Sequence, residues 1–206
     1  DNGTWSGHVR IYQNINGTWT KIGNDIDGEA VADYSGRSVS LSANGSIVAI
    51  GAYWNDGNGT DSGHVRIYQN VNGSWTKIGD DIDGEAGRTS WGMGMGVDPG
   101  DFSGDSVSLS ADGSVVAIGA IGNNGNGKDS GHVRIYQNVN GNWTKIGEDI
   151  DGEADNDKSG TSISLSADGS VVAIGAQRND GRGTYSGHVR IYQNVNGTWT
   201  KIGNDI

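Results

Sequence analysis

The residues best suited to chemistry are carboxylates that recur in a short connector. The sequence Asp-x-Asp-Gly-Glu occurs three times, and its acidic residues are Asp25, Asp27, Glu29, Asp81, Asp83, Glu85, Asp149, Asp151 and Glu153. Hard cations such as calcium take six to eight oxygen ligands, and clustered carboxylates in a glycine-bearing loop supply them. We therefore expect calcium at this connector. The alternative is that these residues only form turns and cap backbone groups.

Histidine also recurs once per repeat, always directly after a glycine, as His8, His64, His132 and His188. No second type of metal ligand repeats beside these histidines at the spacing of a zinc site. We therefore expect them to make polar contacts between repeats or at the rim.

Asn-x-Ser/Thr sequons form a third set, at Asn2, Asn16, Asn44, Asn58, Asn72, Asn142 and Asn196. Such sequons are acceptors for N-linked glycans in secreted proteins. Several of them coincide with an Asn-Gly pair, which a tight hairpin turn favours for backbone reasons alone. The sequence predicts glycosylation at some of these sites in material of secretory origin, and leaves the turn explanation open.

Enzyme motifs are missing from the sequence. It contains no Gly-x-Ser-x-Gly elbow, no His-Glu-x-x-His, no P-loop and no cysteine. The net charge of −11 argues against nucleic acid, whose phosphates an acidic surface repels. No apolar run is long enough to span a membrane. We expect a non-enzymatic protein, extracellular or at the cell surface, with calcium as its one candidate cofactor.

The elements that must position these residues are β-hairpins. Residues 7–23 alternate apolar and polar side chains on both sides of an Asn-Gly pair, which is typical of a hairpin. This stretch returns from Gly63, Gly131 and Gly187, and the middle interval is longer than the first and the last, which are equal. The chain is therefore an array of repeats and begins within one, as expected for a piece of something longer.

Each full repeat adds two further strands before its hairpin, for example residues 38–42 and 46–52. Four short antiparallel strands per repeat are typical of propeller blades, whose sheets bury their faces against neighbouring sheets. We predict an all-β fold of tandem four-stranded antiparallel blades. About three and a half such repeats would form an open arc or part of a larger propeller or fibre. The expected units are a half blade at 1–26 and blades at 27–82, 83–150 and 151–206.

The repeat resembles the FG-GAP repeat of integrin-α-like β-propellers. The residues that carry the resemblance are Ser35-Gly36-x-Ser38-Val39, Val48-Ala49-Ile50-Gly51-Ala52 and Gly63-x-Val65-x-Ile67-Tyr68. The resemblance implies a propeller with an adhesive or ligand-binding role. The family's calcium loop is replaced by bare turns at residues 43–45, 111–113 and 167–169. Family-style calcium binding therefore does not carry over to those positions.

An insertion within 87–102, in the second full repeat, breaks the regular spacing. Its large apolar residues, Trp91, Met93, Met95 and Val97, alternate with glycines. Exposed apolar groups of this kind usually mark contacts, and Met and Trp suit interfaces. We predict an interface here, with a loop that folds back over its own blade as the alternative.

Together these observations predict a structural or adhesive module that self-associates. Its partners would be other copies of the chain, joined head-to-tail into a ring or a filament. The alternative function is a ligand- or glycan-binding propeller of the FG-GAP type.

Overall fold

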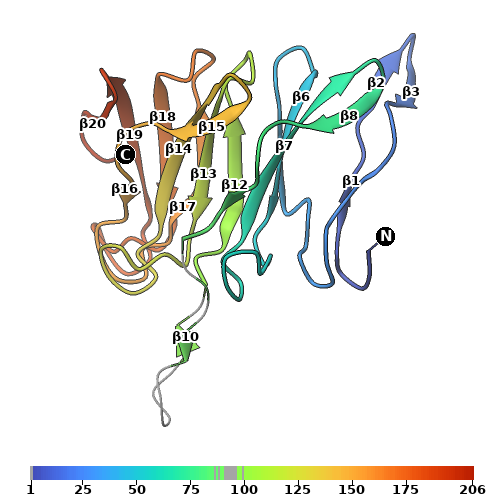
Figure 1. Ribbon diagram of the computed structural model, residues 1–206. Coiled ribbons are helices and arrows are strands. Elements are labelled where there is room, and N and C mark those ends of the chain that lie inside the picture. Colours follow the sequence, from blue (N-terminus) through green and yellow to red (C-terminus); the bar gives the residue numbers. More distant parts are fainter. Residues whose placement is uncertain (1, 86, 88, 91–96, 99) are drawn as a thin grey trace.

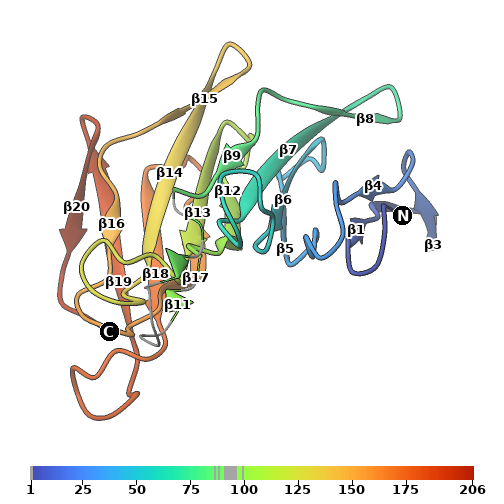
Figure 2. The ribbon, with the colours of Figure 1, turned by 60° about the horizontal axis from the view of Figure 1, so that its bottom comes forward.

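The computed structural model describes residues 2–85, 87, 89–90, 97–98 and 100–206. All regular structure in these residues is β, and the sheets stand side by side in a row that does not close (Figure 1). The N-terminus and the C-terminus lie at opposite ends of the row (Figure 2). No helix of the described residues is long and apolar enough to cross a membrane. The predicted all-β array of antiparallel blades is confirmed.

In the described residues, three complete blades follow a half blade. The half blade holds β1 (His8–Val9), β2 (Tyr12–Ile15), β3 (Thr18–Lys21) and β4 (Ile26–Asp27). Blade I holds β5 (Ser38–Leu41), β6 (Ile47–Ala52), β7 (His64–Val71) and β8 (Ser74–Lys77). Blade II holds β12 (Ser103–Leu109), β13 (Val115–Ala120), β14 (His132–Val139) and β15 (Asn142–Lys145). Blade III holds β17 (Ser159–Leu165), β18 (Val171–Ala176), β19 (His188–Val195) and β20 (Thr198–Ile202).

The acidic connectors return to the blade they leave. β9 (Ile82–Asp83) pairs with β7, so that Asp83 lies opposite His64. β16 (Ile150–Asp151) pairs with β14 in the same way. The expected unit boundary at residue 83 thus falls within a strand of the preceding sheet. This pairing brings the connector carboxylates beside the histidine that begins the third strand.

The first strand of each blade reads Ser-Val-Ser-Leu or a close variant, and its two faces meet different neighbours. The serine face bonds to the next blade: Ser38 Oγ donates to the Gly104 carbonyl at 2.7 Å, and the Leu109 amide donates to Ser40 Oγ at 3.0 Å. Alternate residues of a strand point to opposite faces. The valine and leucine of this strand therefore face the preceding blade.

The hydrophobic core lies between the sheets. One buried cluster combines Val65 and Ile67 of blade I with Val116 and Ile118 of blade II. Equivalent clusters fill the junctions of the half blade with blade I and of blade II with blade III. A single blade with apolar side chains on both faces cannot bury them alone, so each blade depends on its neighbours.

A tryptophan hydrogen bond closes the outer part of each junction. The indole Nε1 of Trp75 donates to the Ile22 carbonyl at 2.9 Å. Trp143 and Trp199 repeat this bond to the carbonyls of Ile78 and Ile146 at 3.0 and 2.9 Å. The same donor and acceptor therefore recur at all three junctions of the described chain.

The first strand of blade I lacks a covering strand. Val39 and Leu41 on β5 are 54% and 49% exposed, whereas their equivalents in blade II, Val107 and Leu109, are 9% and 7% exposed. In blade II these side chains pack against β5 and β6, but the described half blade has no inner strands to offer β5.

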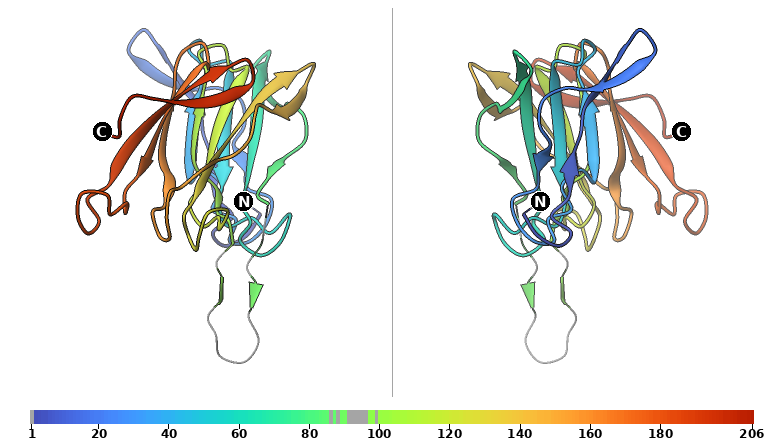
Figure 3. Two further views of the ribbon diagram at one scale, coloured as in Figure 1. Left: turned by 90° about the vertical axis from the view of Figure 1, so that its left-hand side faces the viewer. Right: turned by 90° about the vertical axis from the view of Figure 1, so that its right-hand side faces the viewer.

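The insertion carries a small hairpin, in which β10 (Thr89–Ser90) pairs with β11 (Val97–Asp98). This hairpin projects away from the row of blades (Figure 3). Val97 lies on β11, while Trp91, Met93 and Met95 lie outside the described residues. The expected interface role of the insertion stays a prediction.

The two leucines give a matched test of core packing between blades. Leu109→Ala should lower the free energy of unfolding by about 2–5 kcal/mol, because it empties a buried site. Leu41→Ala, at the equivalent but exposed position, should change it by about 0.5 kcal/mol or less in dilute solution. Urea denaturation of both variants measures the difference. Equal losses for the two would contradict packing between blades as the source of stability.

Candidate functional site: a repeated histidine–carboxylate cluster

Among the residues that the structure describes, three equivalent groups of one histidine and two carboxylates lie at the edge of the blades. Their members are Glu29, His64 and Asp81; Glu85, His132 and Asp149; and Glu153, His188 and Asp205. Within each group the candidate ligand atoms, an imidazole nitrogen and one oxygen of each carboxylate, lie within 4.8 Å of one another. Each group is therefore compact enough to hold a single ion.

Each member comes from a different part of the chain. The histidine begins the third strand, the aspartate lies just beyond the end of the fourth strand, and the glutamate comes from the preceding connector. The glutamate turn is held by a buried aspartate. In blade III, Asp157 Oδ2 accepts hydrogen bonds from the amides of Glu153 and Ala154 at 3.2 and 3.0 Å.

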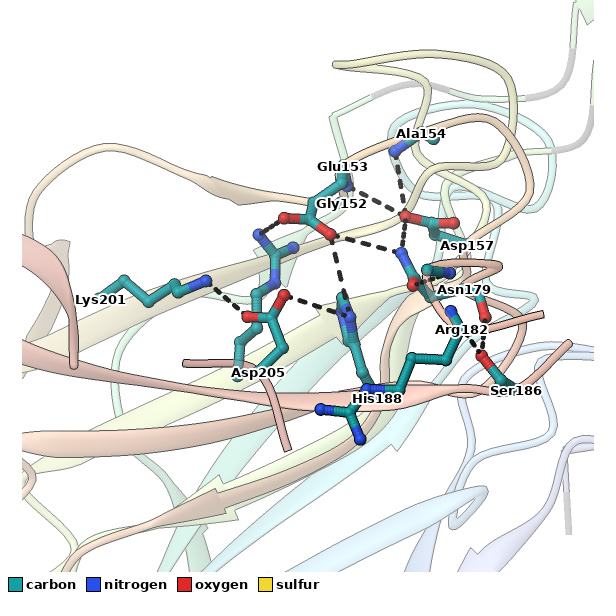
Figure 4. A network of polar contacts seen from close by, with 12 residues as sticks. Gly152, Glu153, Ala154, Asp157, Asn179, Arg182, Ser186, His188, Lys201 and Asp205 are labelled. Carbon is teal, nitrogen blue, oxygen red and sulfur yellow. Dashed lines mark hydrogen bonds and ion pairs between the residues drawn. The ribbon is translucent and has the colours of Figure 1, made fainter. Parts of the chain in front are cut away.

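Figure 4 shows the group of blade III. The Nδ1 atom of His188 lies 3.8 Å from an oxygen of Glu153 and 3.8 Å from an oxygen of Asp205. The other oxygen of Glu153 meets Arg190 at 3.2 Å, and the other oxygen of Asp205 meets Lys201. Each carboxylate thus points one oxygen at a cation and one at the imidazole. The surrounding cavity measures about 620 Å³ and is also lined by Asn179 and Arg182.

The histidines are buried. The side chains of His64 and His132 are 2% and 1% exposed. Burial, followed by the charge of Arg66 or Arg134, lowers the pKa of these imidazoles to about 4. Asp81 and Asp149 oppose the shift. Both rings are therefore neutral at pH 7.

The ring nitrogens of these histidines lack good hydrogen-bond partners among the described residues. Among the described residues, Nε2 of His64, His132 and His188 is buried without a hydrogen-bond partner. The Nδ1 atoms face carboxylate oxygens at 3.7–3.8 Å, which is beyond hydrogen-bond distance. Buried polar atoms are nearly always paired in native proteins, so this arrangement is unusual.

The structure divides the connector carboxylates into different environments. Glu29, Asp81, Glu85, Asp149 and Glu153 join the histidine groups. Asp25 instead meets Lys21 at 2.7 Å and Arg10 at 2.8 Å. The hydrogen bonds from Lys21 and Arg10 lower the pKa of Asp25 to about 2.

The central aspartates of the connectors, Asp27, Asp83 and Asp151, stand outside the three groups. Their backbone carbonyls accept hydrogen bonds from Arg66, Arg134 and Arg190 at 3.2, 2.7 and 3.2 Å. Burial, followed by the charge of a neighbouring aspartate, raises the pKa of the Asp83 and Asp151 side chains. Calcium at the connector as a whole stays a prediction. Each group in the structure instead combines one histidine with two carboxylates, one glutamate and one aspartate.

The sequence predicted polar contacts for the histidines, and the structure places three of them within a group that also holds two carboxylates. The glutamate and the aspartate lie on opposite sides of the histidine in the chain, so no short motif joins them. The one available signal was that all three residue types recur with the repeat.

The sequon asparagines lie at the surface, most of them in turns. Asn16, Asn72 and Asn196 hold positive φ angles in the hairpin turns, as their Asn-Gly pairs predict. The Nδ2 atom of Asn58 donates to the Gly84 carbonyl at 2.8 Å, and that of Asn2 donates to the Gly28 carbonyl at 2.7 Å. Glycosylation of any sequon stays a prediction.

Comparison with known families identifies the repeat. Residues 26–68, which run from the first connector into the third strand of blade I, match the FG-GAP repeat. The resemblance drawn from the sequence is confirmed there. No curated protein matches the chain in sequence.

Solved structures share the fold at low identity. A candidate 6-phosphogluconolactonase from Bacteroides uniformis ATCC 8492 is 13% identical with a TM-score of 0.61, over 98% of this chain and 49% of its own. A second, from Bacteroides fragilis NCTC 9343, is 16% identical with a TM-score of 0.54, over 86% of this chain and 40% of its own. This chain spans less than half the length of either. At such identity the likeness shows the propeller-type fold alone.

The buried histidines predict a loss of stability in mild acid. In the unfolded chain a histidine takes up a proton near pH 6.5, whereas His64 and His132 resist protonation until about pH 4. Their contribution to the free energy of unfolding is therefore fully present above pH 6.5. It is lost as the pH falls toward 4, by up to about 3 kcal/mol per histidine.

Urea denaturation at pH 7 and pH 4.5, in metal-free buffer, measures this effect. The double variant His64→Gln/His132→Gln should lose much of the difference between the two pH values. The raised pKa values of Glu85, Asp83 and Asp151 favour the folded state as the pH falls, which is the opposite effect. The test is therefore the difference in pH dependence between the unmodified chain and the variant. An identical pH dependence in the variant would contradict the assignment.

Proposed function

We propose that this chain is a non-enzymatic, extracellular structural or adhesive module that associates head-to-tail with other copies. The observation that carries the proposal is that the junction between blades, which occurs three times in the described part of the chain, leaves one of its two surfaces exposed at each end of the row. The FG-GAP repeat and the sequons support an extracellular role.

The head face is the hairpin of the half blade. Trp19 is 68% exposed and Tyr12 is 47% exposed, whereas Trp75, Trp143 and Trp199 are partly buried at their junctions. Each of those three tryptophans donates its indole to an isoleucine carbonyl of the preceding blade. The described residues offer Trp19 no such acceptor.

The tail face is the outer side of blade III. Val189 is 36% exposed, although its equivalents Val65 and Val133 are 0% exposed. Ile202 is 43% exposed and occupies the position whose carbonyl accepts the tryptophan bond at every other junction. Trp19 of one copy and Ile202 of another are therefore a complementary donor and acceptor.

Because head and tail are different surfaces, the contact is heterologous. Such contacts close a ring if the rotation fits and form a filament if it does not. The half blade supplies no inner strand to this contact, so the junction between copies buries less surface area than a junction within the chain. Association should accordingly be weaker than the packing of neighbouring blades.

The candidate lactonases do not alter this proposal. At 13–16% identity they share the fold, and a fold shared at this level hosts many unrelated functions.

Sedimentation velocity tests the proposal. The average mass of the chain should rise with concentration between about 10 µM and 1 mM, because a weak contact of about 4–7 kcal/mol has a dissociation constant in this range. Trp19→Ala should abolish the rise, because it removes both the indole donor and the exposed ring. Trp5→Ala is the matched control, since Trp5 is 67% exposed but is not part of the β2–β3 hairpin and stacks on Tyr34. A monomer at all concentrations, or equal behaviour of the two variants, would overturn the proposal.

A second candidate function has its own observation. Five aromatic residues, Trp5, Tyr34, Tyr53, Trp54 and Phe102, form a connected surface cluster with ring centroids 5.1–6.2 Å apart. A cavity of about 370 Å³ beside it is also lined by Arg37. Aromatic walls with a few polar groups are typical of ligand sites. This cluster supports a glycan-binding face.

The Trp5→Ala and Trp19→Ala variants distinguish glycan binding from self-association. On a glycan array, Trp5→Ala should lose any binding that the unmodified chain shows, while Trp19→Ala should retain it. Binding that survives Trp5→Ala, or an array without any binding, would contradict the glycan-binding face.

A further inference from the structure

We infer that each histidine–carboxylate group is a binding site for a divalent first-row transition ion such as zinc, held by one imidazole nitrogen and two carboxylate oxygens. This inference is independent of the proposed self-association, because two of the three groups lie within the chain away from its exposed tail. Their residues are Glu29, His64 and Asp81, and Glu85, His132 and Asp149.

The spacing of the donor atoms fits such an ion. Zinc binds nitrogen and oxygen at about 2.0–2.2 Å, which places neighbouring ligands of a tetrahedral site roughly 3.4 Å apart. The Nδ1 atom of His132 lies 3.7 Å from Asp149, and Nδ1 of His188 lies 3.8 Å from both of its carboxylates. A small inward movement of the exposed glutamate completes three ligands, and water would take the fourth position.

The histidine gives the second and independent reason. Its side chain is more than nine-tenths buried in all three groups, and its Nδ1 lies 3.7–3.8 Å from the aspartate oxygen of its group without a hydrogen bond to it. In blade III a glutamate oxygen also lies 3.8 Å from this Nδ1. A neutral imidazole has one protonated nitrogen and one lone pair. With the proton on Nε2, the Nδ1 lone pair faces the carboxylate oxygens, and a cation placed between them would remove that repulsion.

The neighbouring cations orient the carboxylates. Arg66 holds one oxygen of Glu29 at 3.0 Å, and Lys77 holds one oxygen of Asp81 at 2.6 Å. The oxygen of Asp81 that remains is the one directed at His64. Partners that fix the free oxygen of a ligand in this way are typical of metal sites.

The donor set selects the class of ion. Calcium takes six to eight oxygen ligands, whereas imidazole suits zinc and its neighbours. A group of one nitrogen and two oxygens therefore favours a transition ion over the calcium expected from the connector acids alone.

Isothermal titration with zinc chloride, on the full chain without a polyhistidine tag, tests the inference. Saturation should occur at about three ions per chain, one for each group. His132→Gln should lower the number to two. His8→Gln is the matched control and should leave it at three, because His8 carries the same local sequence but belongs to none of the described groups.

A second pair of variants guards against loss of folding at the buried histidine. Glu85 is 43% exposed at its side chain, so Glu85→Gln should fold normally and still remove one ion. Glu148→Gln changes an exposed glutamate outside the groups and should remove none. The inference is overturned if zinc does not saturate, if neither His132→Gln nor Glu85→Gln lowers the number of ions, or if calcium chloride titrates the same sites equally well.

Discussion

Every blade of this protein depends on burial against the next blade. A four-stranded sheet with valine and isoleucine on both faces cannot shield them by itself, and the described core accordingly lies in three clusters between sheets. The serine bonds of the inner strand and the tryptophan bond of the outer hairpin fix how neighbouring blades meet. The same requirement explains why Val39 and Leu41 on β5, and Val189 on blade III, are exposed, although their equivalents in blade II are buried.

Much of this arrangement could be predicted from the sequence. Alternation on both sides of an Asn-Gly pair located the hairpins, and the structure places Asn16, Asn72, Asn140 and Asn196 at positive φ in their turns. The repeat then required similar sheets in tandem. What the repeat did not predict was the course of the acidic connector. Its Ile-Asp pair forms a short strand that returns to the blade before it, because the start of the third strand lies beyond the fourth strand and offers free backbone groups there.

The pairing of this short strand with the preceding blade forms the candidate site. It brings the carboxylates of two successive connectors to one histidine, although the sequence presents each connector as a single acidic run. Reasoning from the run alone predicted calcium and treated the histidine as a polar contact. Burial of the ring beside oriented carboxylates is a property of the packed blades, and no local pattern could show it.

The central claim is that the exposed head and tail are two halves of one junction, and a mixing experiment tests it most directly. A Trp19→Ala chain keeps its tail, and an Ile202→Asp chain keeps its head. Each alone should sediment as a monomer, whereas an equal mixture should form a dimer and stop there, because only one competent pair of faces exists. Mixtures that remain monomeric, or single variants that still associate, would contradict the account.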